Sequence, residues 1–203
     1  MPRIIIINYG MGNIRNIQRG LQLAGAVADV STQPKELVNA DAIVLPGVGA
    51  FRDAITNLAP FSKTLLKMID ARIPVIGICL GLQLLFTQST EDGLHQGLDI
   101  FQGQIVRLPK SQKVPQMGWN TFTIVDFNNP LVQGIPDHSY VYFIHSYYAQ
   151  IEQSEDVVAV THYGIDIPAI VARETVFATQ FHPEKSGEIG QQMLKNFVTY
   201  IKK

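Results

Sequence analysis

The sequence predicts an α/β fold, an open and mostly parallel mixed sheet with helices on both faces. The first half of the chain alternates short runs of β-branched residues with segments of helical periodicity, three times in succession. The earliest of these runs is apolar at every position, as expected for a strand that is covered on both faces of a parallel sheet. Repeated strand–helix units of this kind build open α/β sheets.

The three units follow one another from the first residues. In each, a short apolar strand leads through a turn into a helix with one apolar face. They are the strand Ile4 to Ile7 with a helix through Ile14, Ile17, Leu21 and Ala24, the strand Ala42 to Leu45 with a helix from about Phe51 to Ala71, and the strand Val75 to Cys79 with a helix from Leu80 to Thr87.

The second half of the chain changes character. It holds short strand candidates separated by polar residues or by Pro and Gly, and we expect some of them to pair in antiparallel fashion. These are Gln104 to Leu108, Asn120 to Val125, Val141 to His145, Val157 to Thr161, Ile167 to Val171 and Val176 to Phe181. A last amphipathic helix, with Ile189, Met193, Phe197 and Ile201 on one face, is expected to pack back on the sheet.

Composition limits the domain organisation and the classes of function. With 203 residues, 46% apolar and 16% charged, we expect one globular domain over residues 1–203. A net charge of -1 without a basic stripe argues against nucleic-acid binding. One cysteine cannot form an internal disulfide, and the first apolar run is too short for a signal peptide or a membrane span. We therefore expect a cytoplasmic protein that does not bind membranes.

The single cysteine lies where a predicted strand meets a predicted helix. Cys79 is flanked by Gly77 and Gly81, and this pattern is typical of a nucleophile elbow, a tight turn that exposes one side chain. The start of the following helix favours a thiolate there. Taken alone, an apolar-flanked cysteine is more often an inert buried residue.

A candidate base follows the last predicted strand. His182 and Glu184 are two residues apart, and in an extended chain such residues point the same way, so we expect the two side chains to lie together. An imidazole held by a carboxylate can take a proton from a thiol, which is the logic of a nucleophile, base and orienter triad. By themselves the two residues could equally form a surface pair. The elbow and this pair together favour a triad.

Two glycine-containing turns have different interpretations. Gly47, Val48 and Gly49 follow the second predicted strand, and their backbone N–H groups could bind an oxyanion beside Cys79. The turn Gly10-Met-Gly12 lacks the third glycine of a dinucleotide fingerprint, so we predict a simple turn with Asn13 as a helix N-cap. The histidines show no ligand spacing, and we expect no metal and no cofactor.

Six segments then resemble one family closely. They are residues 8–14 (Asn-Tyr-Gly-Met-Gly-Asn-Ile), 46–49 (Pro-Gly-Val-Gly), 77–83 (Gly-Ile-Cys-Leu-Gly-Leu-Gln), 115–120 (Pro-Gln-Met-Gly-Trp-Asn), 142–148 (Tyr-Phe-Ile-His-Ser-Tyr-Tyr) and 180–186 (Gln-Phe-His-Pro-Glu-Lys-Ser). The chain resembles class I, triad-type glutamine amidotransferases, which implies a flavodoxin-like sheet. Within that family it is similar to the glutaminase subunits of imidazole glycerol phosphate synthase, over nearly its whole length.

The resemblance implies an activity and a partner. Such subunits hydrolyse glutamine to glutamate and ammonia through a cysteine thioester. They pass ammonia to a (β/α)8-barrel cyclase subunit, which makes imidazole glycerol phosphate and AICAR in histidine biosynthesis. The two subunits form a heterodimer, and we expect glutamine hydrolysis to be slow until the cyclase and its ligand bind, because the turn at residues 46–49 is flexible enough for a peptide flip.

The resemblance also implies roles for individual residues. The catalytic residues are Cys79 as nucleophile, His182 as base and then acid, and Glu184 as orienter; the oxyanion is bound by backbone amides of Gly47, Val48, Gly49 and Leu80; glutamine is bound by Gln83, His145, Ser146 and Tyr147, partly through the backbone. The residues that match the cyclase interface are Met11, Asn13, Asn16, Trp119, Asn120, Tyr142 and Lys185. A single Trp is more often a core residue than an interface residue. His145 is expected to be a packed residue at a strand end rather than a second base.

One departure and three alternatives remain. Asn8 stands where many relatives have Asp, which removes a charge near the partner face without touching the triad. A glutaminase for the pyridoxal-phosphate-forming complex would share the triad but not residues 115–120 and 142–148. A second-copy amidotransferase that feeds amidino-sugar synthesis would share nearly every motif. A non-catalytic cysteine sensor or binding protein on a similar sheet would lack the His-Pro-Glu run.

Overall fold

An eight-stranded sheet forms the centre of the computed structural model, which describes residues 1–202 of the chain. Its strands, in spatial order, are β2 (Val27–Ser31), β1 (Arg3–Ile7), β3 (Ala42–Leu45), β4 (Val75–Ile78), β14 (Val176–Thr179), β13 (Asp166–Arg173), β12 (Val157–His162) and β9 (Thr123–Ile124). The first five are parallel, and the others continue the sheet in antiparallel fashion. The predicted fold class is confirmed.

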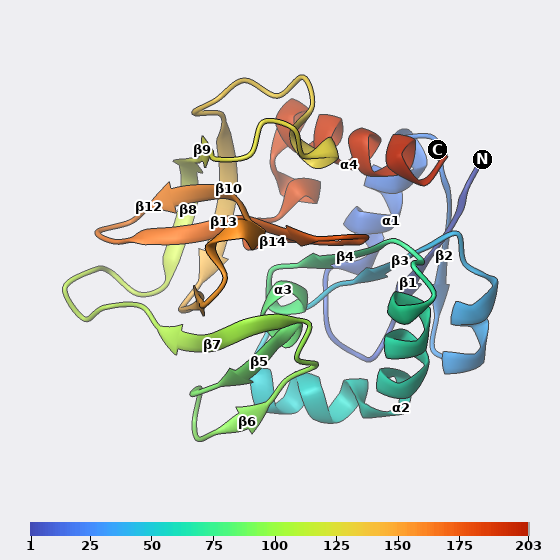
Figure 1. The fold of residues 1–203 in the computed structure, drawn as a ribbon, viewed down its shortest axis with the longest axis horizontal. Helices are drawn as coiled ribbons and strands as arrows, with labels where there is room; N and C mark the ends of the chain where they lie inside the picture. The colour runs from blue at the N-terminus through green and yellow to red at the C-terminus, as the bar shows by residue number, and fades with distance from the viewer. Residues whose placement is uncertain (203) are drawn as a thin grey trace.

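Helices cover both faces of this sheet. In Figure 1 the sheet is seen nearly edge-on, with α1 (Ile14–Leu23) and α4 (Gly187–Ile201) above it and α2 (Phe51–Asp70) and α3 (Leu80–Leu84) below it. Alternate residues of β1 explain why both layers are needed. Ile4 and Ile6 are buried in the cluster that includes α1 and α4, whereas Ile5 and Ile7 are buried in the cluster under α2.

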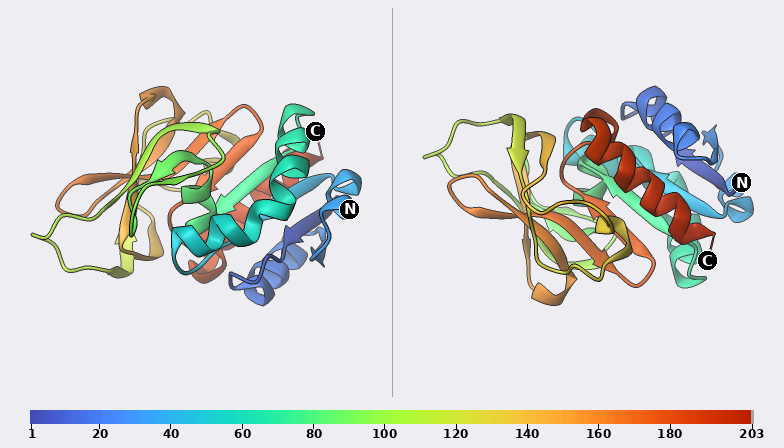
Figure 2. Two further views of the ribbon diagram at one scale, coloured as in Figure 1. Left: turned by 90° about the horizontal axis from the view of Figure 1, so that it is seen from below. Right: turned by 90° about the horizontal axis from the view of Figure 1, so that it is seen from above.

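A second lobe of strands packs beside the helical layers, as the two views of Figure 2 show. It contains a four-stranded sheet in the order β11 (Tyr147–Ile151), β7 (Phe101–Arg107), β5 (Phe86–Ser89) and β6 (His95–Gln96), and the antiparallel pair β10 (Tyr140–His145) and β8 (Gln116–Thr121). Four 3₁₀ turns, η1 (Pro34–Asn39), η2 (Pro130–Val132), η3 (Ser154–Asp156) and η4 (Pro183–Lys185), complete the described elements.

Two predicted elements differ most from the structure. The helix expected from Leu80 to Thr87 stops after one turn at Leu84, because Phe86 begins β5 and packs its ring 5.6 Å from that of Phe101. The strand expected from Asn120 to Val125 is broken into β8 and β9 at Phe122, whose ring stacks on Phe181 in the core. In both cases a buried aromatic side chain overrides the local pattern.

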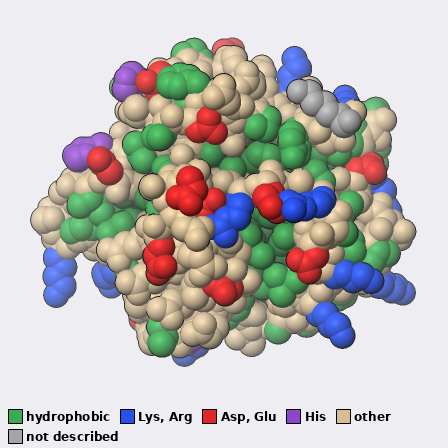
Figure 3. Space-filling view, viewed as in Figure 1, with side chains coloured by type: hydrophobic (Ala, Val, Ile, Leu, Met, Phe, Trp, Pro, Cys, Tyr) green, Lys and Arg blue, Asp and Glu red, His purple; other side chains and the backbone are tan. Residues whose placement is uncertain are grey.

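Several strands have no counterpart in the prediction. They are β2, β5, β6 and β11. The edge strand β2 has a weak signal because Val27 and Val30 are exposed while polar Ser31 is buried. On the face drawn in Figure 3, acidic and basic side chains are interspersed among apolar ones. Among residues 1–202, no helix is both long enough and apolar enough to cross a bilayer.

Candidate active site

Cys79 lies in a strained turn between β4 and α3. Its φ is +55° and its ψ is -108°, a backbone conformation that costs about 1–3 kcal/mol and needs support from its surroundings. That support comes from the Cys79 N–H, which donates to the Thr179 carbonyl at 2.7 Å. A Cβ on Gly81 would lie 1.9 Å from the Leu45 carbonyl oxygen, so only glycine fits there. The turn therefore has the shape of the expected nucleophile elbow.

His182 and Glu184 do lie side by side, but not for the predicted reason. Strand β14 ends at Thr179, and Pro183–Lys185 form the 3₁₀ turn η4 rather than extended chain. The turn brings His182 Nδ1 within 2.8 Å of Glu184 Oε1, and these side chains are only 2% and 0% exposed. The His182 N–H also donates to the Tyr142 carbonyl at 3.0 Å, which ties the turn to β10.

The electrostatic environment favours a charged His182. Burial alone would lower the pKa of His182, but interactions with Cys79 and with Glu184 outweigh burial and raise the pKa to about 10. Nε2, the other ring nitrogen, is buried and has no hydrogen-bond partner of ordinary geometry among the described residues. His182 can therefore stay charged next to the cysteine sulfur, and its Nε2 can exchange a proton with a bound molecule.

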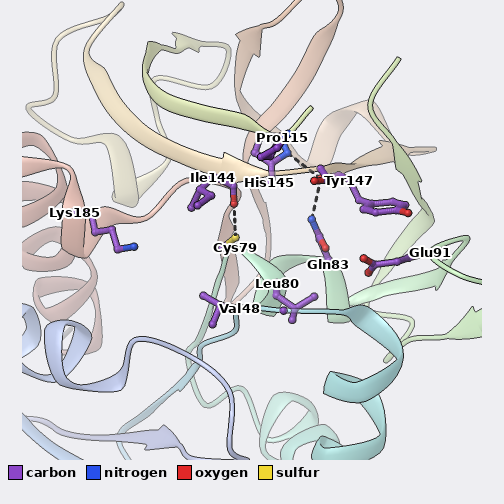
Figure 4. A pocket seen from close by; sticks show the side chains of 12 residues that line it. Val48, Cys79, Leu80, Gln83, Glu91, Pro115, Ile144, His145, Tyr147 and Lys185 are labelled. Carbon is purple, nitrogen blue, oxygen red and sulfur yellow. Dashed lines mark hydrogen bonds between the residues drawn. The ribbon is translucent and has the colours of Figure 1, made fainter. Parts of the chain in front are cut away.

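A cavity of about 310 Å³ opens in front of Cys79 (Figure 4). Its walls include nine residues that the sequence had singled out, namely Val48, Gly49, Cys79, Leu80, Gln83, His145, Ser146, Tyr147 and Lys185. Gly47, His182 and Glu184 do not line it. The volume is at the small end of the range for ligand pockets, which suits a single amino acid.

The turn at residues 46–49 has the backbone freedom expected of an oxyanion site. Gly49 has a φ of +111°, and a Cβ on Gly47 would lie 2.7 Å from the Tyr9 hydroxyl. Tyr9 donates its hydroxyl to the Pro46 carbonyl at 2.6 Å. Burial, with a smaller contribution from Cys79, raises the pKa of Tyr9. Within residues 1–202, the N–H groups of residues 47–49 donate no hydrogen bond, so they remain available to a ligand.

The side chains of Gln83 and His145 are used inside the protein. Gln83 Nε2 donates to the Tyr147 carbonyl at 2.9 Å, and His145 Nδ1 donates to the same oxygen at 2.9 Å (Figure 4). Burial lowers the pKa of His145 to about 4, against the raising effect of the Tyr147 hydrogen bond, and nearby His182 lowers it further. His145 is thus neutral near pH 7 and holds the wall of the cavity in place, in line with the expectation of a packed strand-end residue.

Sequence reasoning gave no role to two residues of the site. Glu91 contributes a carboxylate to the cavity, where its Oε2 accepts from the Phe51 N–H at 2.7 Å and burial raises its pKa. The polar residues that follow Ser89 could have indicated a turn that carries Glu91. The helix predicted as far as Thr87 left no place for such a turn next to the cavity. Gln180 is fully buried and places Nε2 3.9 Å from Cys79 Sγ; its position two residues before His182 was the signal for it.

The residues expected at a partner interface fall into two groups. Trp119 is 56% exposed, which excludes a core role, and its ring meets Tyr142 edge-on at 6.0 Å between centroids. Lys185 Nζ lies 5.7 Å from the centre of the Tyr142 ring. Asn120 differs from these, because its amide donates to Thr161 and to the His162 carbonyl and so braces β12.

The remaining interface candidates lie at the start of α1. Met11 packs against the oxyanion turn, since a Cβ on Gly49 would lie 2.6 Å from the Met11 Cε. Asn16 is exposed. Asn13 occupies the N-cap position, but its side chain makes no capping hydrogen bond. Among residues 1–202, no group of three or more His, Cys, Asp or Glu side chains is placed to hold a metal ion.

Comparisons with known proteins agree with one another. The family model described as "Glutamine amidotransferase class-I" matches residues 5–201. The chain is 49% identical over 201 residues to a Methanosarcina mazei protein named "Imidazole glycerol phosphate synthase subunit HisH", covering 98% of both chains. It is 47% identical over 199 residues to the protein of the same name from Caldanaerobacter subterraneus subsp. tengcongensis, covering 97% of this chain and 98% of the relative.

Solved structures support the fold at low sequence identity. PurLQS from Thermotoga maritima superposes with a TM-score of 0.78 at 19% identity, covering 98% of both chains. The glutaminase domain of Trypanosoma brucei CTPS, solved with bound acivicin, gives a TM-score of 0.71 at 14% identity, covering 98% of this chain and 92% of that one.

Proposed function

The chain belongs to the class I glutamine amidotransferase family, and from that premise we propose that it is the glutaminase subunit of an imidazole glycerol phosphate synthase. The observation that carries the chemistry is the buried His182–Glu184 pair, held behind the elbow that presents Cys79 to a cavity of amino-acid size. The full-length similarity to two HisH subunits, at 49% and 47% identity, supports the synthase assignment over other glutaminases.

The first half of the reaction forms a thioester. The Cys79 thiolate attacks the side-chain amide carbon of glutamine, and backbone N–H groups of the turn at residues 47–49 and of Leu80 bind the oxyanion. The C–N bond then breaks as His182 Nε2 gives its proton to the leaving nitrogen, which departs as ammonia. The acyl group remains on sulfur.

The second half of the reaction restores the site. The neutral His182 takes a proton from water while the water oxygen attacks the thioester carbon, and the C–S bond breaks to give glutamate and the thiolate. Glu184 keeps Nδ1 protonated throughout, which fixes the ring orientation and leaves Nε2 for the reaction. His145 takes no part in proton transfer, because its Nδ1 is committed to Tyr147 and its pKa of about 4 keeps the ring neutral.

Glutamine is held by the opposite side of the cavity. We assign the α-amino group to Glu91, because its carboxylate is the acid among the residues that line the cavity. We assign the α-carboxylate end to backbone N–H groups of Ser146 and Tyr147, because both residues line the cavity and Gln83 supports this segment through the Tyr147 carbonyl. This places the side-chain amide toward Cys79.

The partner proposed for this chain is a (β/α)8-barrel cyclase that consumes ammonia in a heterodimer. The two HisH relatives are by name subunits, which supports a complex. The exposed Trp119 and Lys185 each lie against the half-buried ring of Tyr142, and this set has the composition of an interface hot spot. They lie next to the site, since Lys185 lines the cavity and the Tyr142 carbonyl accepts from the His182 N–H.

The test uses glutamine labelled with ¹⁵N in its side-chain amide. The full-length chain is assayed alone and with its cyclase and the cyclase's nucleotide substrate, measuring glutamate release and label in imidazole glycerol phosphate. We expect slow glutamate release by the chain alone, faster release in the complex, and label in the product. A Cys79→Ser control should lose both signals. Glutamate release that never exceeds that of Cys79→Ser would sink the proposal.

A further inference from the structure

Gln180 is a buried polar side chain that the mechanism above does not use. It is fully buried directly after the end of β14, and its backbone N–H donates to the Ala169 carbonyl at 2.9 Å. Its Nε2 lies 3.9 Å from Cys79 Sγ, within reach of a hydrogen bond to sulfur. Burying an amide costs free energy unless its hydrogen bonds are made, so the partners of this side chain deserve a physical account.

A backbone carbonyl fixes which end of this amide faces the sulfur. The Tyr147 carbonyl can only accept, so Gln83 must turn Nε2 toward it, at 2.9 Å. The second hydrogen on Gln83 Nε2 then points to Gln180 Oε1, at 3.3 Å. With Oε1 occupied in this way, Gln180 presents Nε2 to Cys79. A reversed Gln180 would set two N–H donors against each other.

The polarity of this contact matters for the cysteine. An N–H group can donate to a thiolate but cannot accept the proton of a thiol, so it favours the charged form of sulfur. The group placed to accept from a neutral thiol is different: the Ile144 carbonyl, 3.6 Å from Cys79 Sγ (Figure 4). Two neighbours of Cys79 therefore favour opposite protonation states.

We propose that Gln180 stabilises the Cys79 thiolate directly through its Nε2–H, with its polarity set by Gln83 and the Tyr147 carbonyl. This makes Gln180 a further catalytic residue of the reaction, and in that sense it rests on the proposed function. Gln83 and Tyr147 line the cavity. The hydrogen bonds from the Tyr147 carbonyl through Gln83 and Gln180 therefore connect the wall that holds glutamine with the sulfur that attacks it.

The thiolate can be measured without the glutaminase reaction. Cys79 is the one cysteine in the chain, so alkylation by iodoacetamide reports this sulfur alone. The rate is measured against pH for the full-length chain and for two neutral variants that remove the amide, Gln180→Met and Gln180→Leu, whose side chains differ in shape. In both variants we expect the midpoint of the profile to move upward by about one pH unit.

Two further variants separate polarity from packing. Gln83→Met leaves Gln180 intact but frees it to reverse, and we expect a smaller upward shift of the midpoint. Gln116→Met is the matched control, because Gln116 is another buried glutamine and has no hydrogen-bonded partner among residues 1–202. Its midpoint should equal that of the wild type. Thermal unfolding verifies that each variant is folded, and Gln180→Leu tests the proposal if Gln180→Met does not fold.

The outcomes for Gln180 and for the proposed function are distinct. Wild-type midpoints in the folded Gln180 variants would overturn the Gln180 assignment, even with full glutaminase activity in the complex. If neither Gln180 variant folds, a Gln83→Met midpoint equal to the wild type overturns it. Upward shifts with no glutamate release by the wild-type complex would uphold the thiolate contact and reject the glutaminase. Upward shifts together with a fall in kcat, measured in the complex, support both.

Discussion

The two buried histidines at the active site lie in opposite electrostatic environments. His182 belongs to a group that we call the charged wall, made of Cys79, which lines the cavity, and of the buried His182 and Glu184, which do not. Against the effect of burial, interactions with Cys79 and Glu184 raise the pKa of His182 to about 10. His145 belongs to a neutral wall, made of Gln83, His145 and Tyr147, where burial lowers its pKa to about 4. The difference does not come from burial, because both rings are buried. It comes from Cys79, which favours a charged His182, and from the partner of Nδ1, which is a carboxylate for His182 and a backbone carbonyl for His145.

The comparison separates chemistry from binding. A histidine paired with a carboxylate can carry and release a proton during turnover, whereas one hydrogen-bonded to a carbonyl and kept neutral can only hold geometry. We therefore expect changes on the charged wall to act on kcat and changes on the neutral wall to act on KM or on stability.

The largest effect is expected from replacing His182 by glutamine, and the same replacement of His145 serves as the comparison. His182→Gln removes the proton carrier, and kcat for glutamine hydrolysis should fall by about 10⁴-fold or more. His145→Gln can still donate to the Tyr147 carbonyl, so kcat should stay within about 10-fold of the wild type while KM rises. Both are measured by glutamate release in the cyclase complex. Equal losses of kcat would remove the distinction between the two walls.

A smaller loss is expected from Glu184→Gln, which keeps the shape of the orienter but removes its charge. The amide can face His182 with either end, so part of the population holds the wrong tautomer, and kcat should fall by about 10³-fold. Cys79 and Glu184 both raise the pKa of His182, and the variant loses the contribution of Glu184, so the ring should titrate at lower pH in NMR spectra. An unchanged titration of His182 would mean that Cys79 alone sustains the charged ring.

The sequence predicted the charged wall better than the neutral one. The parallel strands that carry Cys79 and His182 are apolar on both faces, a pattern that few other structures produce. The motifs around them then indicated a triad. The contact between His182 and Glu184 was nevertheless expected from extended chain, and it arises from the 3₁₀ turn η4. Pro183 at the start of that turn fits this geometry as well as the one expected.

The neutral wall depends on features that periodicity does not report. The apolar run after Gln83 continues smoothly into Phe86, so the end of α3 and the start of β5 could not be located. Glu91 reaches the cavity only because β5 turns the chain back toward Phe51. The orientation of the Gln180 amide depends on Gln83 and on a carbonyl 33 residues away in the chain, at Tyr147. Such contacts are set by tertiary packing.

The opposite pKa values predict opposite pH dependence of stability. His145 binds a proton in the unfolded chain below about pH 6.5 but not in the folded protein until about pH 4, so stability falls as the pH decreases across this window, by about 3 kcal/mol in total. His182 has a raised pKa, so its contribution is complete below about pH 6.5 and is lost as the pH rises toward 10.

Urea unfolding measured at several pH values checks this sign. His145→Asn keeps a donor for the Tyr147 carbonyl without a titrating ring, and it should lose less stability than the wild type between pH 6.5 and pH 4. His162, which is paired with Asp166 at the surface, gives an exposed control: His162→Asn should stay close to the wild-type curve, because exposed ion pairs contribute little to stability. If His145→Asn and the wild type lose stability in parallel, the ring of His145 is not held neutral.

The smallest effect is expected from removing the Tyr9 hydroxyl, which supports the oxyanion turn next to the charged wall. Tyr9→Phe removes the hydroxyl that donates to the Pro46 carbonyl, and the buried carbonyl then lacks its partner at a cost of about 1 kcal/mol. Because the turn binds charge that exists only in the transition state, the looser turn should lower kcat by about 3- to 10-fold and leave KM unchanged. Tyr148→Phe is a matched control, since within residues 1–202 the Tyr148 hydroxyl only accepts from Gln150, at 3.3 Å. A rise in KM at constant kcat would instead mean that Tyr9 supports the binding of glutamine. The division of the site into a wall that acts on kcat and a wall that acts on KM would then be wrong next to the oxyanion turn.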